Sequence, residues 1–180
     1  MELIEGIKGR RSVRKFKNTN ISAEQIKEIV EIARFAPSWK NSQTTRYKAV
    51  IDADLKIRLA KECMMNFEYN INTALNAPAI VVVTTINNRS GFERDGSFTT
   101  SKGTHWQSFD AGIATQTFCL AAYEKELATV IMGIFDEEKV AKLLNISPEE
   151  SVSALVALGY ADEHPVAPKR KEADSILEIL

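Results

Sequence analysis

The feature that most constrains the fold is a long segment with helical spacing and little polar surface, from about Ser108 to Lys125. One side of it carries Ala111, Ala114, Thr115, Phe118 and Ala122, and much of the rest is covered by Ile113, Gln116, Leu120 and Ala121. A helix with so small a polar face is buried or lies at an interface. The chain must therefore surround this helix with other elements or cover it with a partner.

Strand-like and helical patterns alternate along the rest of the chain. Runs of strand length lie at residues 48–51, 79–86, 128–132 and 152–158, and helical patterns lie at residues 3–7, 26–33, 55–65 and 136–144. The 26–33 helix has the clearest boundaries, because Ser22 and Gln25 form a capping box before it and Pro37 stops the pattern after it. This alternation predicts a sheet covered by helices. A length of 180 residues fits one domain, residues 1–180.

Composition and charge exclude several classes of function. The 23 Lys and Arg are balanced by 24 Asp and Glu, so the chain lacks the basic excess of a general nucleic-acid binder. The longest apolar run, residues 77–83, is far shorter than the roughly 20 residues of a membrane span. Cys63 and Cys119 form no CxxC, and there is no HExxH, which disfavours a metal site. We therefore expect a protein of the reducing cytoplasm without nucleic-acid, membrane or metal partners.

A dense basic stretch follows the N-terminal helical pattern. Arg10, Arg11, Ser12 and Arg14 place three guanidinium groups and a hydroxyl close together, and residues 10, 12 and 14 face one way if the segment is extended. Arginine offers forked donors to phosphate oxygens and serine offers a further one. The sequence has neither GxGxxG nor a P-loop motif, so any phosphate binding must come from side chains. A solvated basic surface is the other interpretation.

The most unusual segment is residues 36–43, Ala-Pro-Ser-Trp-Lys-Asn-Ser-Gln. It follows a helix, where a loop can present Ser38, Asn41 and Gln43 to a flat polar ligand. A turn whose side chains cap that helix is the alternative. After the 128–132 strand, Met132 and Gly133 either let a ligand approach the backbone closely or form an ordinary strand-to-helix turn.

Two further segments have a less regular pattern. Residues 87–105 carry three glycines together with Phe92 and Phe98, and they predict either a lid over a binding site or a disordered insertion. The tail, residues 165–180, contains the basic run 169–171 and ends in an apolar pattern at Ile176, Leu177, Ile179 and Leu180. We interpret Asp110 and Asp136 as residues that begin helices, and Ser12 has no GxSxG setting, so acyl transfer is not indicated.

Four motifs occur in an order that resembles a known family. Arg-Arg-Ser-x-Arg comes first, then Ala-Pro-Ser-x-x-Asn-x-Gln, then Asp-x-Gly-x-Ala-x-Gln at residues 110–116, and finally Gly159-Tyr160 before the basic tail. Together they resemble the nitroreductase family of flavin-dependent oxidoreductases over nearly the whole chain. The resemblance implies an α+β fold: an α-β-α sandwich around a central mixed, largely antiparallel sheet, in an intertwined homodimer whose C-terminal tail wraps the partner.

The resemblance also implies a cofactor site for noncovalently bound FMN at the dimer interface. The phosphate and ribityl chain would be held by Arg10, Arg11, Ser12 and Arg14, with Lys169 and Lys171 from the tail. The flavin ring would be bordered by Pro37, Ser38, Trp39 and Asn41 of the other subunit, and approached by Met132 and Gly133. Asn70 matches an Asn that contacts the flavin in some members, but Asn66 and Asn72 compete for that place.

The reaction implied by the resemblance is a ping-pong exchange. NAD(P)H would deliver hydride to flavin N5, and an electron-poor small molecule such as a nitroaromatic or a quinone would then take the electrons, with no side chain as an obligatory acid or base. Phe92, Phe98 and Trp106 are candidates to stack on an aromatic acceptor, or they simply pack. The alternatives are reductive dehalogenation, a flavin-storing or flavin-sensing protein, and a dimeric scaffold without ligand. The chain departs from the family pattern at two places: Thr44-Thr45 stands where the family usually has Pro-Trp, and Ala128 stands where a glycine is common. These departures put the substrate pocket in doubt more than the binding of FMN.

Overall fold

The computed structural model describes residues 2–180, which form helices on both sides of one sheet. In chain order the elements are α1 (Leu3–Gly9), α2 (Ala23–Ala33), the 3-10 turn η1 (Trp39–Asn41), β1 (Thr45–Val50), α3 (Ala53–Cys63), α4 (Glu68–Asn76), β2 (Ala79–Ile86), α5 (His105–Glu124), β3 (Ala128–Met132), α6 (Glu137–Leu143), β4 (Glu150–Gly159) and η2 (Ala173–Ser175).

The sheet has the strand order β1-β2-β4-β3, and each neighbouring pair is antiparallel. β2 and β4 lie in the middle, and β2 is buried along almost its whole length, which explains its unbroken apolar sequence. A parallel contact joins Ser12 to Thr129 of the edge strand β3. The result is the predicted α+β architecture with a largely antiparallel sheet.

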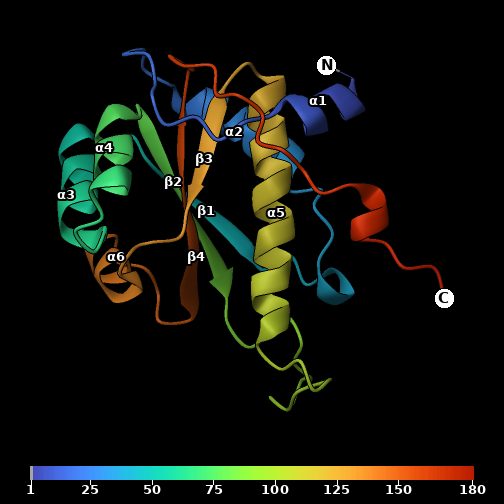
Figure 1. Ribbon diagram of the computed structural model, residues 1–180. Helices are drawn as coiled ribbons and strands as arrows, with labels where there is room; N and C mark the ends of the chain where they lie inside the picture. The colour runs from blue at the N-terminus through green and yellow to red at the C-terminus, as the bar shows by residue number, and fades with distance from the viewer. Residues whose placement is uncertain (1) are drawn as a thin grey trace.

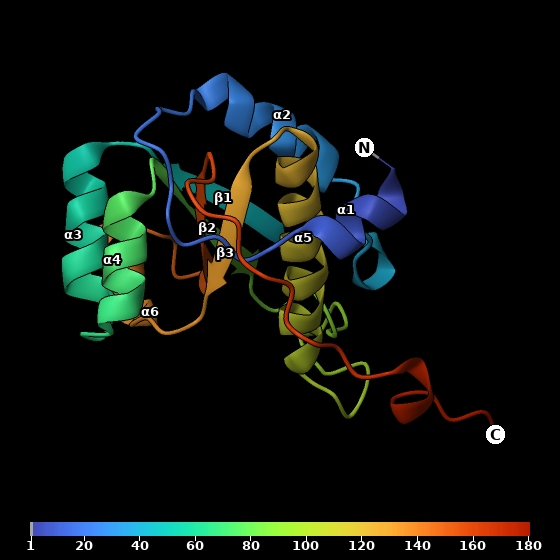
Figure 2. The same cartoon turned by 45° about the horizontal axis from the view of Figure 1, so that its top comes forward.

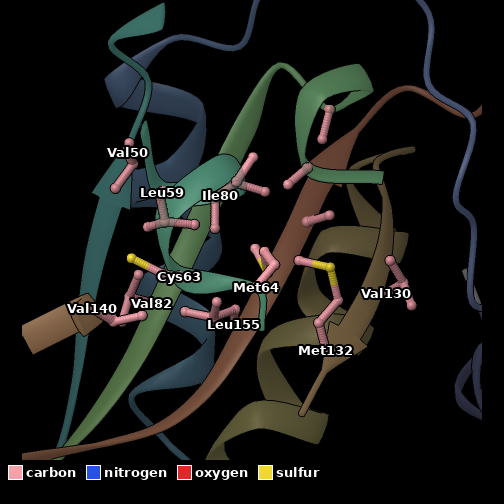
Figure 3. Close-up of a cluster of buried hydrophobic side chains, with 14 of the residues drawn as sticks. Val50, Leu59, Cys63, Met64, Ile80, Val82, Val130, Met132, Val140 and Leu155 are labelled. Atoms are coloured by element: carbon pink, nitrogen blue, oxygen red, sulfur yellow. The ribbon is translucent and has the colours of Figure 1, made fainter. Parts of the chain in front are cut away.

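Two helical layers enclose the sheet (Figures 1 and 2). α3, α4 and α6 cover one face, and α2 and α5 cover the other. Figure 3 shows the first core, where Leu59 and Cys63 of α3 and Val140 of α6 point toward Val82 and Leu155 of the sheet. The second core joins α2 and α5 to the opposite side chains of the same strands. Alternate residues of β2 and β4 thus serve different cores.

We expect Leu59→Ala to lower the free energy of unfolding by about 2–5 kcal/mol, because Leu59 is fully buried and its loss leaves a cavity. Ile57→Ala on the same helix is the matched control, since Ile57 is 39% exposed and should cost much less. Urea denaturation of both variants measures the difference. Equal losses would contradict the assignment of Leu59 to the core.

Several predicted boundaries are confirmed. β2 and β3 have the predicted limits, and the Ser22–Gln25 capping box forms with both reciprocal hydrogen bonds. Asp136 accepts a hydrogen bond from the Lys139 amide at the start of α6, as its interpretation as a helix-start residue requires. The helix α4 was not predicted, because its sequence Glu-Tyr-Asn-Ile-Asn-Thr-Ala-Leu-Asn has only a short apolar pattern.

The interpretation of Asp110 as a helix-start residue is wrong. α5 begins at His105, so Asp110 lies inside the helix, and its side chain is buried. Asp110, Ala114, Phe118 and Ala121 recur at helical spacing on the buried side of α5. This periodicity was the available sequence signal that Asp110 faces inward rather than toward the helix terminus.

Tyr47 provides a prediction about alkaline stability. Its ring stacks on Phe118 at 5.3 Å, its hydroxyl donates to the Ala114 carbonyl oxygen, and burial raises its pKa from 10.0 to about 12. Below pH 10 folded and unfolded chains both keep this proton. Between pH 10 and 12 the unfolded chain loses it first, so stability should fall by at most about 1 kcal/mol per pH unit. The free energy of unfolding of Tyr47→Phe should fall less steeply between pH 10 and 12 than that of the original chain. The same slope against pH in both proteins would contradict the raised pKa of Tyr47.

Two segments extend from the layered body. Residues 87–104 form a loop below α5 in Figure 1, in which Phe92 pairs with Phe98 and the Thr99 amide donates to the Gly91 carbonyl oxygen. The tail leaves β4 and runs past α5 to the C-terminus, where Ile176, Leu177, Ile179 and Leu180 are exposed. Their functions as lid and dimer-wrapping tail stay predictions. No helix of residues 2–180 combines the length and apolarity needed to span a membrane.

Candidate functional site

The basic segment begins where α1 ends. Arg10 is the C-terminal cap of α1, and the chain then becomes extended, so that the Val13 amide donates to the Thr129 carbonyl oxygen of β3. Arg11 donates to two backbone carbonyls, those of Lys8 and Arg10. Within residues 2–180, none of the ion pairs involves Arg10, Arg11 or Arg14. These three guanidinium groups thus form no ion pair in the described chain, although Glu126 and Glu163 line a cavity together with Arg10 and Arg11.

A cavity of about 390 Å³ adjoins this segment. Its lining includes Arg10, Arg11, the end of α5 at Tyr123, and Thr129. Burial raises the pKa of the Cys119 thiol of α5, and the Thr129 hydroxyl and the Arg10 cation oppose that rise. The cavity thus lies between the basic segment, the start of β3 and the C-terminal end of α5.

Glu163 fixes the position of Arg14. Its Oε1 accepts hydrogen bonds from the backbone amides of Arg14, at 2.6 Å, and Lys15, at 3.2 Å. The Asp162 amide donates back to the Lys15 carbonyl oxygen, so the start of the tail and the basic segment run side by side. No sequence pattern indicated Glu163, because its partners are backbone groups far away in the chain.

Met132 and Gly133 lie at the other end of β3. The Thr129 carbonyl accepts its hydrogen bond from Val13 on the side of β3 that faces away from β4. Backbone groups of an edge strand point to this side at every second residue, so those of Ile131 and Gly133 point outward as well. A Cβ placed on Gly133 would meet no atom within 4 Å, so this edge is open. The four-residue step from Thr129 to Gly133 spans roughly 13 Å. The edge therefore offers an elongated surface with cations at one end and free backbone groups at the other.

The structure separates the three candidate asparagines. Asn70 donates from Nδ2 to the Ile134 carbonyl oxygen at 3.1 Å, which places it next to the Met132–Gly133 turn. Asn72 lines a cavity that Arg14 also lines. Asn66 has a positive φ of 56° in the turn between α3 and α4 and lines neither this cavity nor that of Arg10. Asn70 and Asn72 thus remain candidates on geometry, and Asn66 is the weakest of the three.

The loop with Pro37, Ser38, Trp39 and Asn41 lies against the first half of α5. The Trp39 amide donates to both carboxylate oxygens of Asp110, at 3.1 and 2.9 Å, and the Gln43 amide donates to Ser38 Oγ. Pro37 and Ser38 line a second cavity, of about 360 Å³, with Asp110 and Tyr47. This cavity shares no lining residue with the cavity of Arg10.

The two halves of the candidate site are therefore apart within one chain. Asp110 holds the 37–41 loop, whereas Tyr123 lines the cavity of Arg10, and these two positions are roughly 20 Å apart along α5. Lys169 and Lys171 are exposed, and none of the ion pairs in the described chain includes them. The structure brings Arg10, Arg11, Ser12 and Arg14 together at the β3 edge, but the 37–41 loop lies at a different cavity, and Lys169 and Lys171 line neither cavity of the basic segment.

α5 also has an exposed face with few charges. Phe109 is 59% exposed, and Gly112 and Gln116 follow it at helical spacing. Ile131 of β3, also exposed, lines a cavity of about 510 Å³ with Gly112. Phe109 lies outside this cavity, so α5 presents an exposed, weakly charged face rather than one continuous apolar patch.

Comparisons with known proteins agree with this geometry. The sequence model of the nitroreductase family matches residues 7–160. Spy0809 of Streptococcus pyogenes serotype M6, named on prediction as an NAD(P)H nitroreductase, is 24% identical over 200 residues, covering 99% of both chains. An FMN-dependent nitroreductase of Clostridium difficile R20291 is 25% identical with a TM-score of 0.72, covering 98% of this chain and 95% of its own.

A second solved structure shows the likeness in fold. It is a protein of Exiguobacterium sibiricum 255-15 solved in complex with FMN, and it is 20% identical with a TM-score of 0.86, covering 100% of this chain and 98% of its own. The fold, the motif order and the match over most of the chain lead to one conclusion: the chain belongs to the nitroreductase family.

Proposed function

We propose that this protein is an FMN-dependent oxidoreductase that passes electrons from NAD(P)H to an electron-poor small molecule such as a nitroaromatic or a quinone. The observation that carries the proposal is the group of three arginines that form no ion pair within residues 2–180, at the start of an edge strand whose far end is open at Gly133. Bound FMN would supply the redox chemistry, taking hydride at N5 from NAD(P)H and returning electrons to the acceptor.

The residues at the β3 edge fit such a cofactor. A phosphate needs forked and hydroxyl donors, which Arg10, Arg14 and Ser12 would supply. Arg10 and Arg14 line two different cavities that share Glu163 and Pro165, and Ser12 pairs with Thr129 near the start of β3. Arg11 contributes charge, since its own hydrogen bonds go to backbone carbonyls. A flat polar ring needs backbone donors without an obstructing side chain, which the open turn at Met132 and Gly133 supplies. Asn70, bonded to the Ile134 carbonyl oxygen, fixes the shape of that turn.

We infer a homodimer from the parts of the site that one chain leaves apart. Pro37, Ser38, Trp39 and Asn41 lie about 20 Å along α5 from the cavity of Arg10, so they border the same ligand only if a second chain supplies them. The exposed, weakly charged face of α5 suits the contact between two copies. Lys169 and Lys171 of the tail would help Arg10, Arg11, Ser12 and Arg14 to hold the phosphate.

In this dimer the chain's residues would orient the ring and exclude water, and their cations and amides would stabilise negative charge. No side chain is assigned as an obligatory acid or base. Trp106 packs on Trp39, so its ring supports the loop rather than an acceptor. Phe98 is exposed and leaves a ring face for an aromatic acceptor.

An anaerobic spectral titration tests the proposal. We expect purified or FMN-reconstituted protein to be yellow, to bleach with NADH or NADPH, and to recover its colour when a quinone or nitroaromatic is added. Yellow protein that neither nucleotide bleaches would indicate a flavin-storing or flavin-sensing protein. Protein that takes up no FMN would contradict the cofactor assignment and leave a scaffold without ligand.

A further inference from the structure

We propose that Asp110 is a positioning residue that holds residues 38–43 in one conformation and joins this loop to the 87–104 segment. The effect on a cofactor rests on the proposed function, because the loop borders FMN only if FMN binds. The joining of the two segments stands on the described contacts alone.

The Asp110 carboxylate receives its hydrogen bonds from outside its own helix. The Trp39 amide donates to both oxygens, and Oδ2 also accepts from Ser90 Oγ at 2.5 Å and from Ser42 Oγ at 3.4 Å. The Oγ atoms of Ser42 and Ser90 lie 2.9 Å from each other, within hydrogen-bond distance. Asp110 is 2% exposed, and a buried carboxylate is stable only when such donors surround it. One side chain of α5 therefore connects the loop with the 87–104 segment.

The loop needs this support because its backbone is strained. Lys40, Asn41 and Gln43 have φ values of 44°, 55° and 49°, in the left-handed region that residues with a Cβ rarely adopt. Such conformations persist only where the surroundings hold them. The Trp39 amide, fixed by Asp110, lies directly before this strained stretch.

Contacts on either side of Asp110 join the same two segments. The Trp39 ring packs on Trp106 at 4.5 Å, and Trp106 donates to Thr100 Oγ1 at 2.9 Å. A Cβ on Gly91, whose φ is 86°, would lie 2.7 Å from the Gly103 carbonyl oxygen and 2.9 Å from Trp106, so the loop passes too close for a side chain. Lys40 pairs with Glu93 at 3.2 Å, but both side chains are exposed and this ion pair contributes little.

Movement of the 87–104 segment should affect the 38–43 loop. The Ser90 and Ser42 hydroxyls share Asp110 Oδ2, so withdrawal of the 87–104 segment removes a donor from the carboxylate that fixes Trp39. Opening of this segment and loosening of the loop should therefore occur together. An equivalent carboxylate on the surface would not have this effect, because water would replace the lost donor.

Limited trypsin digestion of the full-length protein without added FMN tests the coupling. Asp110→Ala removes all these hydrogen bonds, and cleavage after Lys40 and after Arg94 should each rise about tenfold. Asp110→Asn keeps one carbonyl oxygen and should restore part of the protection. Cleavage after Lys169 in the exposed tail serves as the reference within each digest. Asp52→Ala, which removes the carboxylate that caps α3, is the matched control and should leave cleavage after Lys40 unchanged.

Ser90→Ala decides the question if Asp110→Ala does not fold, because it keeps the carboxylate and removes the Ser90 hydroxyl, which donates to Asp110 Oδ2 and also contacts Ser42 Oγ and Thr44 Oγ1. Its cleavage after Lys40, a site on the other segment, should rise several-fold. Unchanged cleavage after Lys40 in Ser90→Ala or in folded Asp110→Ala would overturn the proposal.

Cofactor binding then measures the positioning effect. At a temperature where all variants are folded, Asp110→Ala should raise the Kd for FMN about tenfold, and Asp110→Asn should lie between it and the original chain. A side chain that served stability alone would lower Tm and leave this Kd unchanged, which would overturn the positioning role. If the original chain binds no FMN, the proposed function fails, and the digestion still decides whether Asp110 joins the two segments.

Discussion

Replacing Arg10 or Arg14 by alanine should weaken FMN retention by roughly ten- to hundredfold. Each guanidinium lies near the β3 edge, and neither has an ion-pair partner in the part of the chain that the structure describes. Hydrogen bonds between charged groups contribute about 1.5–3 kcal/mol each when they are shielded from water. The FMN content after gel filtration and the Kd from fluorescence quenching measure the loss.

Two variants serve as controls for this prediction. Lys40→Ala removes a cation of the 37–41 loop that pairs with Glu93, and Arg58→Ala removes a guanidinium of α3 that pairs with Glu62. Both ion pairs are exposed, so neither change should lower FMN content appreciably. The same FMN content in all four variants would show that the basic segment does not hold the phosphate.

Removal of residues 172–180 should lower both dimer stability and FMN occupancy, although every proposed phosphate ligand is retained. The deleted segment ends in Ile176, Leu177, Ile179 and Leu180, which are 71%, 60%, 88% and 108% exposed in one chain. Side chains of this kind gain free energy when a second copy covers them, at roughly 25 cal/mol per Å². Because the proposed site takes the 37–41 loop from the other subunit, loss of the dimer should also release the cofactor.

Sedimentation velocity and flavin absorbance measured on the same samples test this second prediction. A full-length chain with Asp174→Ala and Glu178→Ala is the matched control, because it removes charges from the tail and keeps the apolar side chains. Its sedimentation and its flavin absorbance should match those of the original chain. A truncated protein that sediments as a monomer with a full complement of FMN would show that one chain builds the site alone.

Much of the fold could be predicted from local patterns. The alternation of short apolar runs with helical patterns predicted the strands, and β2 and β3 have the expected limits. These predictions succeed because helix caps and the spacing of apolar residues act within a few residues of chain. α4 escaped prediction because its polar sequence becomes helical mainly through packing against α3.

Part of the candidate site could likewise be predicted from adjacent residues, and part could not. The cluster of Arg10, Arg11, Ser12 and Arg14 was visible in the sequence because its members are adjacent, and the structure places it at the start of β3. The structure also separates Asn70, which bonds the Ile134 carbonyl oxygen, from Asn66, a distinction that spacing alone did not make.

Asp110 shows most clearly what only the tertiary structure decided. An aspartate before a run of small residues is typical of a helix start, and the sequence alone supported that interpretation. The fold instead buries it inside α5, where donors from Trp39, Ser42 and Ser90 surround it. Sequence by itself determined most of the segments that become helices and strands, because those preferences are local, and α4 is the exception. The tertiary structure decided which polar groups meet, because a buried charge is stabilised by partners that only the folded chain brings within hydrogen-bond distance.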